Sequence, residues 1–228
     1  MKIGIRVSHI LITRPVARAL ATGFQLSNKG FKVSLLPLTI IKPLLFCEQK
    51  KRPQNIIVSS AASFYYLPKN YLPFFQKANL YCIGEHTAQA AYKYGLRQKP
   101  LIYRDAEELV KNEPELKNLT LYLCGRRRTN NIELYLKDKN YNILECYETL
   151  PHNKNLALIK HNKQKIDIVL FTSVYAAILF KEIKAFLPNN IKLVCFSKRI
   201  AKALGKFDNI YITSIPNEKS AINLIENL

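Results

Sequence analysis

Short, nearly continuous apolar runs recur along the chain, and they limit its possible folds more than any other feature. Examples are residues 55–60, 119–125 and 166–173, in which blocks of Ile, Val, Leu or Phe end at hydroxyl or glycine residues. Strands that are covered on both faces of a parallel sheet have this composition. Between the runs the spacing becomes helical, as at residues 16, 19, 20, 23 and 24. The pattern therefore predicts an α/β fold.

The expected strands follow one another through the whole sequence. We expect them at residues 9–13, 31–38, 55–60, 79–84, 100–103, 119–125, 141–148, 166–173, 191–197 and 209–213. Pro15 suits the first turn of a helix and Gly30 suits the residue after its end, so one helix is expected between them.

The two halves of the sequence resemble each other. With a shift of 113 positions, Ser59–Ser60 fall on Thr172–Ser173, and Cys82 falls on Cys195. We therefore expect two copies of one α/β unit of about 110 residues, with a ligand site between them. Chance similarity between short apolar segments is the alternative.

Composition limits the class of protein. Apolar residues make up 48% of the 228 residues, and no apolar run reaches the roughly 18–20 residues of a membrane span. The N-terminus is basic and then apolar, but Arg6, Arg14 and Pro15 interrupt it, so we expect a strand and a helix rather than a signal peptide. We therefore expect a folded cytoplasmic protein.

The chain is strongly basic, with 35 Lys and Arg against 16 Asp and Glu, a net charge of +19. A nucleic-acid-binding surface would gather these charges into one patch, yet the lysines are spread along the whole chain. A polyanionic small substrate would need only a few basic groups at a cleft. Lysines that merely cover solvated faces are the other explanation, and the net charge alone does not choose between them.

The sequence lacks the familiar cofactor and metal motifs. Its five cysteines never form CxxC and its four histidines lack ligand spacing, so we expect buried thiols and no metal site. Glycine-rich dinucleotide and phosphate loops are absent, as is a serine nucleophile elbow. We expect no cofactor.

Polar residues at the ends of predicted strands are the candidate binding groups. Ser59–Ser60 and Thr172–Ser173 each end a strand and precede a helix, and Gly84 and Thr87 begin another helix. Hydroxyls at such positions cap helices, and the N–H groups and positive dipole end of a helix suit an anion. Ordinary capping is one explanation and carboxylate or phosphate binding is the other, which the recurrence favours.

Arginines follow two further strands. Arg14 comes after "LIT", and Arg126–Arg128 come after "LYLCG". Guanidinium groups bind carboxylates with two parallel hydrogen bonds, although a solvated loop would also explain them.

Together these segments resemble the uroporphyrinogen-III synthase family. The resemblance lies in ILITRP (10–15), IIVSSAASF (56–64), IGEHTAQAAYKYG (83–95), ECYETLP (145–151) and VLFTSVYAAILF (169–180). No single segment is very specific, but their order and spacing cover most of the chain.

The resemblance implies a cofactor-free hydro-lyase that cyclises hydroxymethylbilane to uroporphyrinogen III in haem biosynthesis. In this family the terminal hydroxyl of the linear tetrapyrrole leaves to give an azafulvene, and a spiro intermediate then inverts ring D. Because the bilane alone closes to the unflipped isomer, the enzyme must control which conformation reacts. The partner would be this substrate with its eight carboxylates, with no nucleic acid and no membrane, and we expect a monomer.

The resemblance also assigns residues. Tyr147 matches the family tyrosine suspected of assisting the departure of the hydroxyl as a general acid; an aromatic residue in a linker strand is the alternative. Ser60, Thr87, Thr172 and Ser173 match positions that line the family's cleft.

One corner departs from the family pattern. The second copy of the usual G-x-x-T-A motif has Ser197 and Ile200 in place of Gly and Thr. Either Lys198 or Arg199 compensates for the lost substrate contact, or this corner contributes less.

The family fold implies two similar lobes, each a parallel sheet flanked by helices, joined by a two-stranded linker. Lobe one would take residues 1–37 and 150–228, lobe two residues 42–145, and the linker strands residues 38–41 and 146–149. Such a linker implies hinge opening for ligand entry. The competing hypothesis is a non-catalytic two-lobed protein that binds small anions or nucleic acid.

Overall fold

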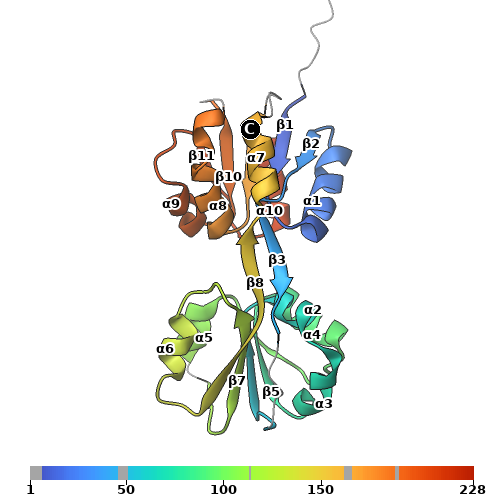
Figure 1. Ribbon diagram of the computed structural model, residues 1–228, viewed down its shortest axis with the longest axis vertical. Helices are drawn as coiled ribbons and strands as arrows, with labels where there is room; N and C mark the ends of the chain where they lie inside the picture. The colour runs from blue at the N-terminus through green and yellow to red at the C-terminus, as the bar shows by residue number, and fades with distance from the viewer. Residues whose placement is uncertain (1–6, 46–50, 113, 162–165, 188–189) are drawn as a thin grey trace, which may run out of the picture. The chain divides into compact units, whose positions relative to one another are not determined.

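The computed structural model describes residues 7–45, 51–112, 114–161, 166–187 and 190–228. It contains two sheets of mainly parallel strands with helices on their faces (Figure 1), which confirms the predicted fold class. The chain divides into two compact units: unit 1 is Met1–Ile40 with Leu150–Leu228, and unit 2 is Ile41–Thr149. Within the described ranges no helix is long and apolar enough to cross a membrane.

Unit 1 is built on a five-stranded parallel sheet with the strand order β11-β10-β9-β1-β2. Its strands are β1 (His9–Ile12), β2 (Lys32–Leu35), β9 (Ile168–Phe171), β10 (Lys192–Cys195) and β11 (Ile210–Ile212). Its helices are α1 (Val16–Asn28), α7 (Asn153–His161), α8 (Val174–Lys181), α9 (Lys198–Leu204) and α10 (Glu218–Glu226), with a 3₁₀ turn at Lys184–Phe186.

Apolar residues cover both faces of this sheet because successive side chains of a strand point to opposite sides. Leu11 and Val169 pack into a core with residues of α8 and α9. Ile10 and Leu170 pack into a second core with residues of α1 and α10. The continuous apolar runs of the sequence are therefore strands buried on both faces.

Unit 2 contains a sheet with the strand order β3-β8-β7-β4-β5-β6. Its strands are β3 (Thr39–Pro43), β4 (Asn55–Val58), β5 (Asn79–Ile83), β6 (Leu101–Tyr103), β7 (Thr120–Gly125) and β8 (Tyr141–Pro151). Its helices are α2 (Ala61–Tyr66), α3 (Leu72–Phe75), α4 (Glu85–Tyr94), α5 (Ala106–Asn112) and α6 (Asn131–Leu136), with a 3₁₀ turn at Lys69–Tyr71.

Strands β3 and β8 pass between the two units and pair with each other. The Leu44 N–H donates to the Cys146 carbonyl (3.3 Å) and the His152 N–H donates to the Leu38 carbonyl (2.8 Å). Because the residue number rises on one strand as it falls on the other, these two strands are antiparallel, whereas β4 to β8 pair in parallel.

The two sheets share one strand arrangement that the chain enters at different points. The parallel strands run β6-β5-β4-β7-β8 in unit 2 and β11-β10-β9-β1-β2 in unit 1. Strands β9, β10 and β11 therefore take the places of β4, β5 and β6, while β1 and β2 take those of β7 and β8. Unit 1 is thus a circularly permuted copy of unit 2.

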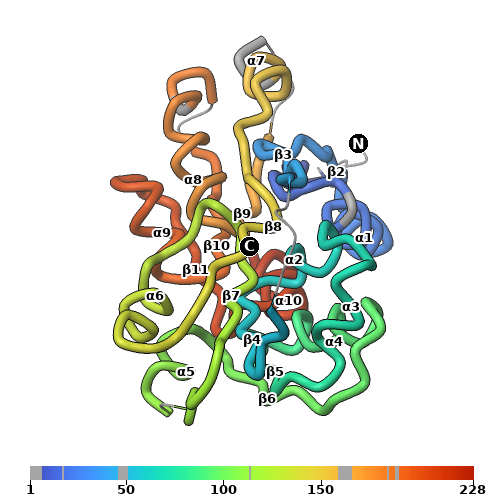
Figure 2. The backbone as a smooth tube through the Cα atoms, turned by 60° about the horizontal axis from the view of Figure 1, so that its bottom comes forward, coloured from blue at the N-terminus to red at the C-terminus, as the bar shows by residue number. Residues whose placement is uncertain are grey.

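The direction of strand succession reverses between β4 and β7 in unit 2, and the tube in Figure 2 shows the chain passing through β5 and β6 before it returns to β7. The corresponding point in unit 1 lies between β9 and β1. Ligands of parallel α/β sheets bind outside the carboxyl ends of the strands at such a reversal. These edges therefore contain the candidate site residues.

Candidate functional site

Two serine hydroxyls lie at the carboxyl end of β4, on opposite faces of the sheet in unit 2. Ser60 caps α2, since its Oγ accepts a hydrogen bond from the Ala62 N–H (3.2 Å). On the other face, desolvation by burial raises the pKa of the Tyr122 phenol, and a side-chain hydrogen bond with Ser59 opposes this rise. Ordinary capping thus accounts for one lone pair of Ser60, and its hydroxyl proton can still be donated.

The start of α4 is the second candidate anion site of unit 2, and its first residues, Glu85 and His86, are exposed. Gly84 precedes the helix with φ +82°, in the left-handed region that favours glycine. No side chain caps this helix among the described residues, and the first N–H groups, those of Glu85 and His86, lack acceptors within a helix. Thr87 is buried and donates to the Ile83 carbonyl (2.6 Å), so its hydroxyl fixes the strand-to-helix turn.

Tyr147 lies half-buried on β8 beside the end of β7. Its carbonyl accepts the Arg126 N–H (2.8 Å), and its ring centroid lies 6.2 Å from that of Tyr66. Desolvation by burial raises the pKa of Tyr147, and a side-chain hydrogen bond with Ser60 opposes this rise. At neutral pH the phenol is therefore protonated and available as a donor.

Arg126 is exposed but already engaged. Its Nε donates to Glu145 (3.0 Å) and its Nη1 lies 3.7 Å from Glu148. These carboxylates raise the pKa of the guanidinium. The side chain is nevertheless 53% exposed. The neighbouring Arg128 binds Glu133 and Glu145 (2.6 and 2.8 Å) and is mostly buried. Arg128 therefore supports the loop, and Arg126 is the arginine of this pair that can meet a ligand.

In unit 1, Thr172 and Ser173 follow β9 as predicted. The Ser173 Oγ caps α8 by accepting from the Ala176 N–H (3.1 Å), and its side chain is exposed. Thr172 is half-buried at the same strand end. Both units thus place a capping serine after the equivalent strand.

The corner that departs from the family pattern is rebuilt in a different way. Ser197 caps α9 by accepting from the Ile200 N–H (3.4 Å), and Ile200 is buried in the core of unit 1. The Phe196 carbonyl, which corresponds to the Ile83 carbonyl bound by Thr87, accepts instead from the Thr213 hydroxyl (3.1 Å). Lys198 is exposed at the start of this helix.

Arg14 follows β1, but it points into the protein. Only 7% of its side chain is exposed, and its Nη1 donates to the Thr22 hydroxyl (2.9 Å) and to Glu218 (3.3 Å). Its carbon Cζ lies 5.9 Å from the centre of the Phe196 ring. Burial lowers the pKa of the guanidinium, and Glu218 raises it. This arginine ties α1 to α10.

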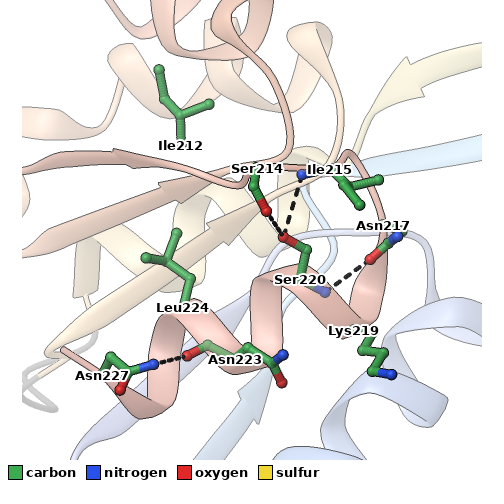
Figure 3. A pocket seen from close by; sticks show the side chains of 9 residues that line it. All are labelled: Ile212, Ser214, Ile215, Asn217, Lys219, Ser220, Asn223, Leu224 and Asn227. Atoms are coloured by element: carbon green, nitrogen blue, oxygen red, sulfur yellow. Dashed lines mark hydrogen bonds between the residues drawn. The ribbon is translucent and has the colours of Figure 1, made fainter.

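A pocket of about 500 Å³ lies between the end of β11 and α10 in unit 1 (Figure 3). Inside it the Ser220 hydroxyl contacts the Ser214 hydroxyl (3.0 Å), and the Asn217 side chain accepts the Ser220 N–H (2.8 Å). The lining residues are Ile212, Ser214, Ile215, Asn217, Lys219, Ser220, Asn223, Leu224 and Asn227. None of the residues predicted from the sequence to bind substrate is among them.

Two partners in these positions could not be predicted from the sequence, because no local pattern marks them. The Thr213 hydroxyl donates to the Phe196 carbonyl, 17 positions earlier, and Glu218 binds Arg14, 204 positions away. Gly125 gave a weak signal, because a glycine at the end of a strand often indicates a close backbone approach. Among the described residues no group of three or more His, Cys, Asp or Glu could hold a metal ion.

Comparison with known proteins places this arrangement in a family. A family model described as uroporphyrinogen-III synthase HemD matches residues 20–223. The chain belongs to the uroporphyrinogen-III synthase family. This confirms the resemblance found in the sequence, and it favours an enzyme of haem biosynthesis over a non-catalytic binding protein.

Solved structures of uroporphyrinogen-III synthases have the same fold. The synthetase of Helicobacter pylori matches with a TM-score of 0.70 at 16% identity, over 97% of this chain and 99% of that chain. A mutant synthase of the extreme thermophile Thermus thermophilus matches with a TM-score of 0.65 at 15% identity, over 97% of this chain and 98% of that chain. A comparison with curated protein sequences gives no match.

Proposed function

We propose that this member of the uroporphyrinogen-III synthase family is a lyase that cyclises hydroxymethylbilane to uroporphyrinogen III with inversion of ring D. The observation that carries the proposal is the family match across residues 20–223. The reaction releases one water, which combines the terminal hydroxyl of the bilane with a proton.

Tyr147 is the proposed donor of that proton. A hydroxyl leaves far more easily as water, and a phenol kept protonated by burial can supply the proton at neutral pH. As the proton moves, negative charge develops on the phenolic oxygen. The hydrogen bond with Ser60, which favours the ionised phenol, stabilises that charge.

The carboxylates of the bilane are the proposed ligands of the strand-end groups. In unit 2 these are the first turn of α4 after Gly84, the hydroxyls at the end of β4, and the exposed face of Arg126. In unit 1 we propose Thr172, Ser173 and Lys198. The net charge of +19 supports a polyanionic substrate, because it raises the local concentration of anions around the protein.

The direct test is incubation with freshly prepared hydroxymethylbilane, followed by oxidation and chromatographic separation of the isomers. We expect the type III isomer; formation of the type I isomer alone would refute the proposal. We expect Tyr147→Phe to lower kcat by about 100-fold, within the usual range of general acids. An unchanged rate in that variant would show that Tyr147 does not act as a general acid. Control of the conformation of the bilane would then account for the formation of the type III isomer.

We further propose that the protein works as a monomer in the cytoplasm. The described cysteines Cys82, Cys124, Cys146 and Cys195 are free and buried, which supports a reducing compartment; Cys47 lies outside the described residues. Sedimentation equilibrium in the presence of a reductant would test the monomer.

A further inference from the structure

An irregularity in the pairing of β7 and β8 determines where Tyr147 points. Cys124 lies beside Glu145, but the next residue, Gly125, lies beside Tyr147, so Cys146 is an extra residue on β8. Such a bulge breaks the alternation of side chains and re-aims them. Consistent with this, Cys146 and Tyr147 both pack against the core formed with α2 and α4, although they are adjacent in sequence.

Gly125 makes room for the phenol that the bulge directs toward it. A Cβ atom built on Gly125 would lie 2.6 Å from Cζ, 2.7 Å from Cε2 and 2.9 Å from Oη of Tyr147. Non-bonded carbon atoms normally approach to about 3.5–4.0 Å, so any side chain at this position would displace the ring. The phenol therefore rests directly on the backbone of Gly125.

Burial raises the pKa of the same phenol, and the side chain of Ser60 at the end of β4 opposes this rise. The Ser60 Oγ accepts the Ala62 N–H (3.2 Å), so its own hydroxyl proton is left for a second partner. Tyr66 borders the ring at a centroid distance of 6.2 Å.

We propose that Gly125 is a positioning residue: together with the bulge at Cys146 and the hydroxyl of Ser60, it forms a seat that aims the Tyr147 phenol at the leaving hydroxyl of the bilane. This inference rests on the proposed function, and it adds how the donor is held. The seat requires glycine at position 125, because a Cβ atom there would occupy the space of the Tyr147 ring.

A double-mutant cycle tests the kinetic part. Gly125→Ala should lower kcat for the type III isomer at least tenfold, because displacing a catalytic group by about 1 Å can cost up to 100-fold, while KM should stay within about twofold because a positioning change acts on the reaction step. In the Tyr147→Phe background the same change should cost less than about twofold, since the donor it positions is gone. Gly23→Ala, in α1 of unit 1, is the control, because its new Cβ would meet mainly the flexible Leu35 side chain at 3.0 Å.

A second cycle, on unfolding, separates this inference from the proposed function. Gly125→Ala should lower the urea midpoint in the wild-type background but not in Tyr147→Ala, where the ring is absent. An unchanged kcat in Gly125→Ala, or an equal loss of rate with and without the Tyr147 hydroxyl, would overturn the positioning role. If the wild-type protein forms only the type I isomer, the proposed function and the catalytic role of Gly125 fall together. An equal midpoint shift in both backgrounds would overturn the seat itself, whatever the activity.

Discussion

Replacing Arg14 distinguishes an arginine that binds substrate from one that holds unit 1 together. Arg14→Met keeps most of the apolar stem and removes the guanidinium that bridges Thr22 and Glu218. We expect the variant to bind the bilane normally and to lose stability in unit 1. Arg14→Lys, which keeps the charge but not the planar guanidinium, is the matched control. The stability of unit 1 in this variant should lie between those of the wild type and Arg14→Met.

The size of the loss follows from the burial of the two partners. Removing one member of a fully buried ion pair costs about 3–5 kcal/mol, but 33% of the Glu218 side chain is exposed and water can replace the arginine there. The Nε of Arg14 is buried without a hydrogen-bond partner among the described residues, so its removal recovers part of the cost. We therefore expect the free energy of unfolding of unit 1 to fall by about 2 kcal/mol, near the value for hydrogen bonds to charged groups.

Hydrogen exchange followed by mass spectrometry resolves this change within the chain. A loss of about 2 kcal/mol corresponds to roughly thirtyfold faster exchange of the most protected amides in α1 and α10. Peptides of unit 2 serve as the internal control and should not change. Unchanged exchange in α1 and α10, combined with a tenfold rise in KM, would show instead that Arg14 binds substrate and does not hold α1 and α10 together.

Two further substitutions and one labelling experiment test other parts of the structure. Ile200→Thr restores the usual family residue but should lower the free energy of unfolding by about 1–2 kcal/mol in urea denaturation. The new hydroxyl would lie in an apolar core, and the Phe196 carbonyl already accepts a hydrogen bond from Thr213. A gain in stability would contradict this prediction. The hydrogen bond from Arg128 holds the pKa of Glu145 below its ordinary 4.5, so this carboxylate stabilises the fold above pH 4.5 and that contribution is lost as the pH falls through the lower folded pKa. Glu145→Gln should therefore be less stable than wild type at pH 7 and approach it at pH 3 in urea titrations, whereas a constant difference would argue against the ion pair. Burial raises the pKa of the described thiols to about 12, so Cys82, Cys124, Cys146 and Cys195 should resist iodoacetamide at pH 8 until the protein unfolds, and rapid labelling of any of them in the native protein would exclude a buried position.

The strands could be predicted because a strand buried on both faces has its own composition. Residues 168–171 and 55–58 are mostly apolar, and each forms a central strand of its sheet. Strand β3 (Thr39–Pro43) is partly exposed and lacks that signal, so only the family resemblance placed a linker strand there. Local composition thus identifies central strands better than peripheral ones.

The candidate site could be predicted only where the interaction is local. Ser60, Ser173 and Ser197 cap the helices that follow them, as the sequence order suggests. The partner of Arg14 lies 204 positions away, and no local pattern could indicate that this arginine turns inward. The direction of the Tyr147 side chain could not be predicted either. The bulge at Cys146 interrupts the alternation of side chains along β8, and nothing in the composition of this segment indicates it.

The permuted arrangement of unit 1 also affects the order in which the protein can fold during synthesis. Strand β1 is made before unit 2, whereas its neighbour β9, which begins at residue 168, is made after unit 2. At typical rates of about 5–20 residues per second, β1 waits on the order of ten seconds for β9. Unit 2 can therefore complete its sheet first, while β1 and β2 stay exposed to chaperones and proteases until β9 leaves the ribosome.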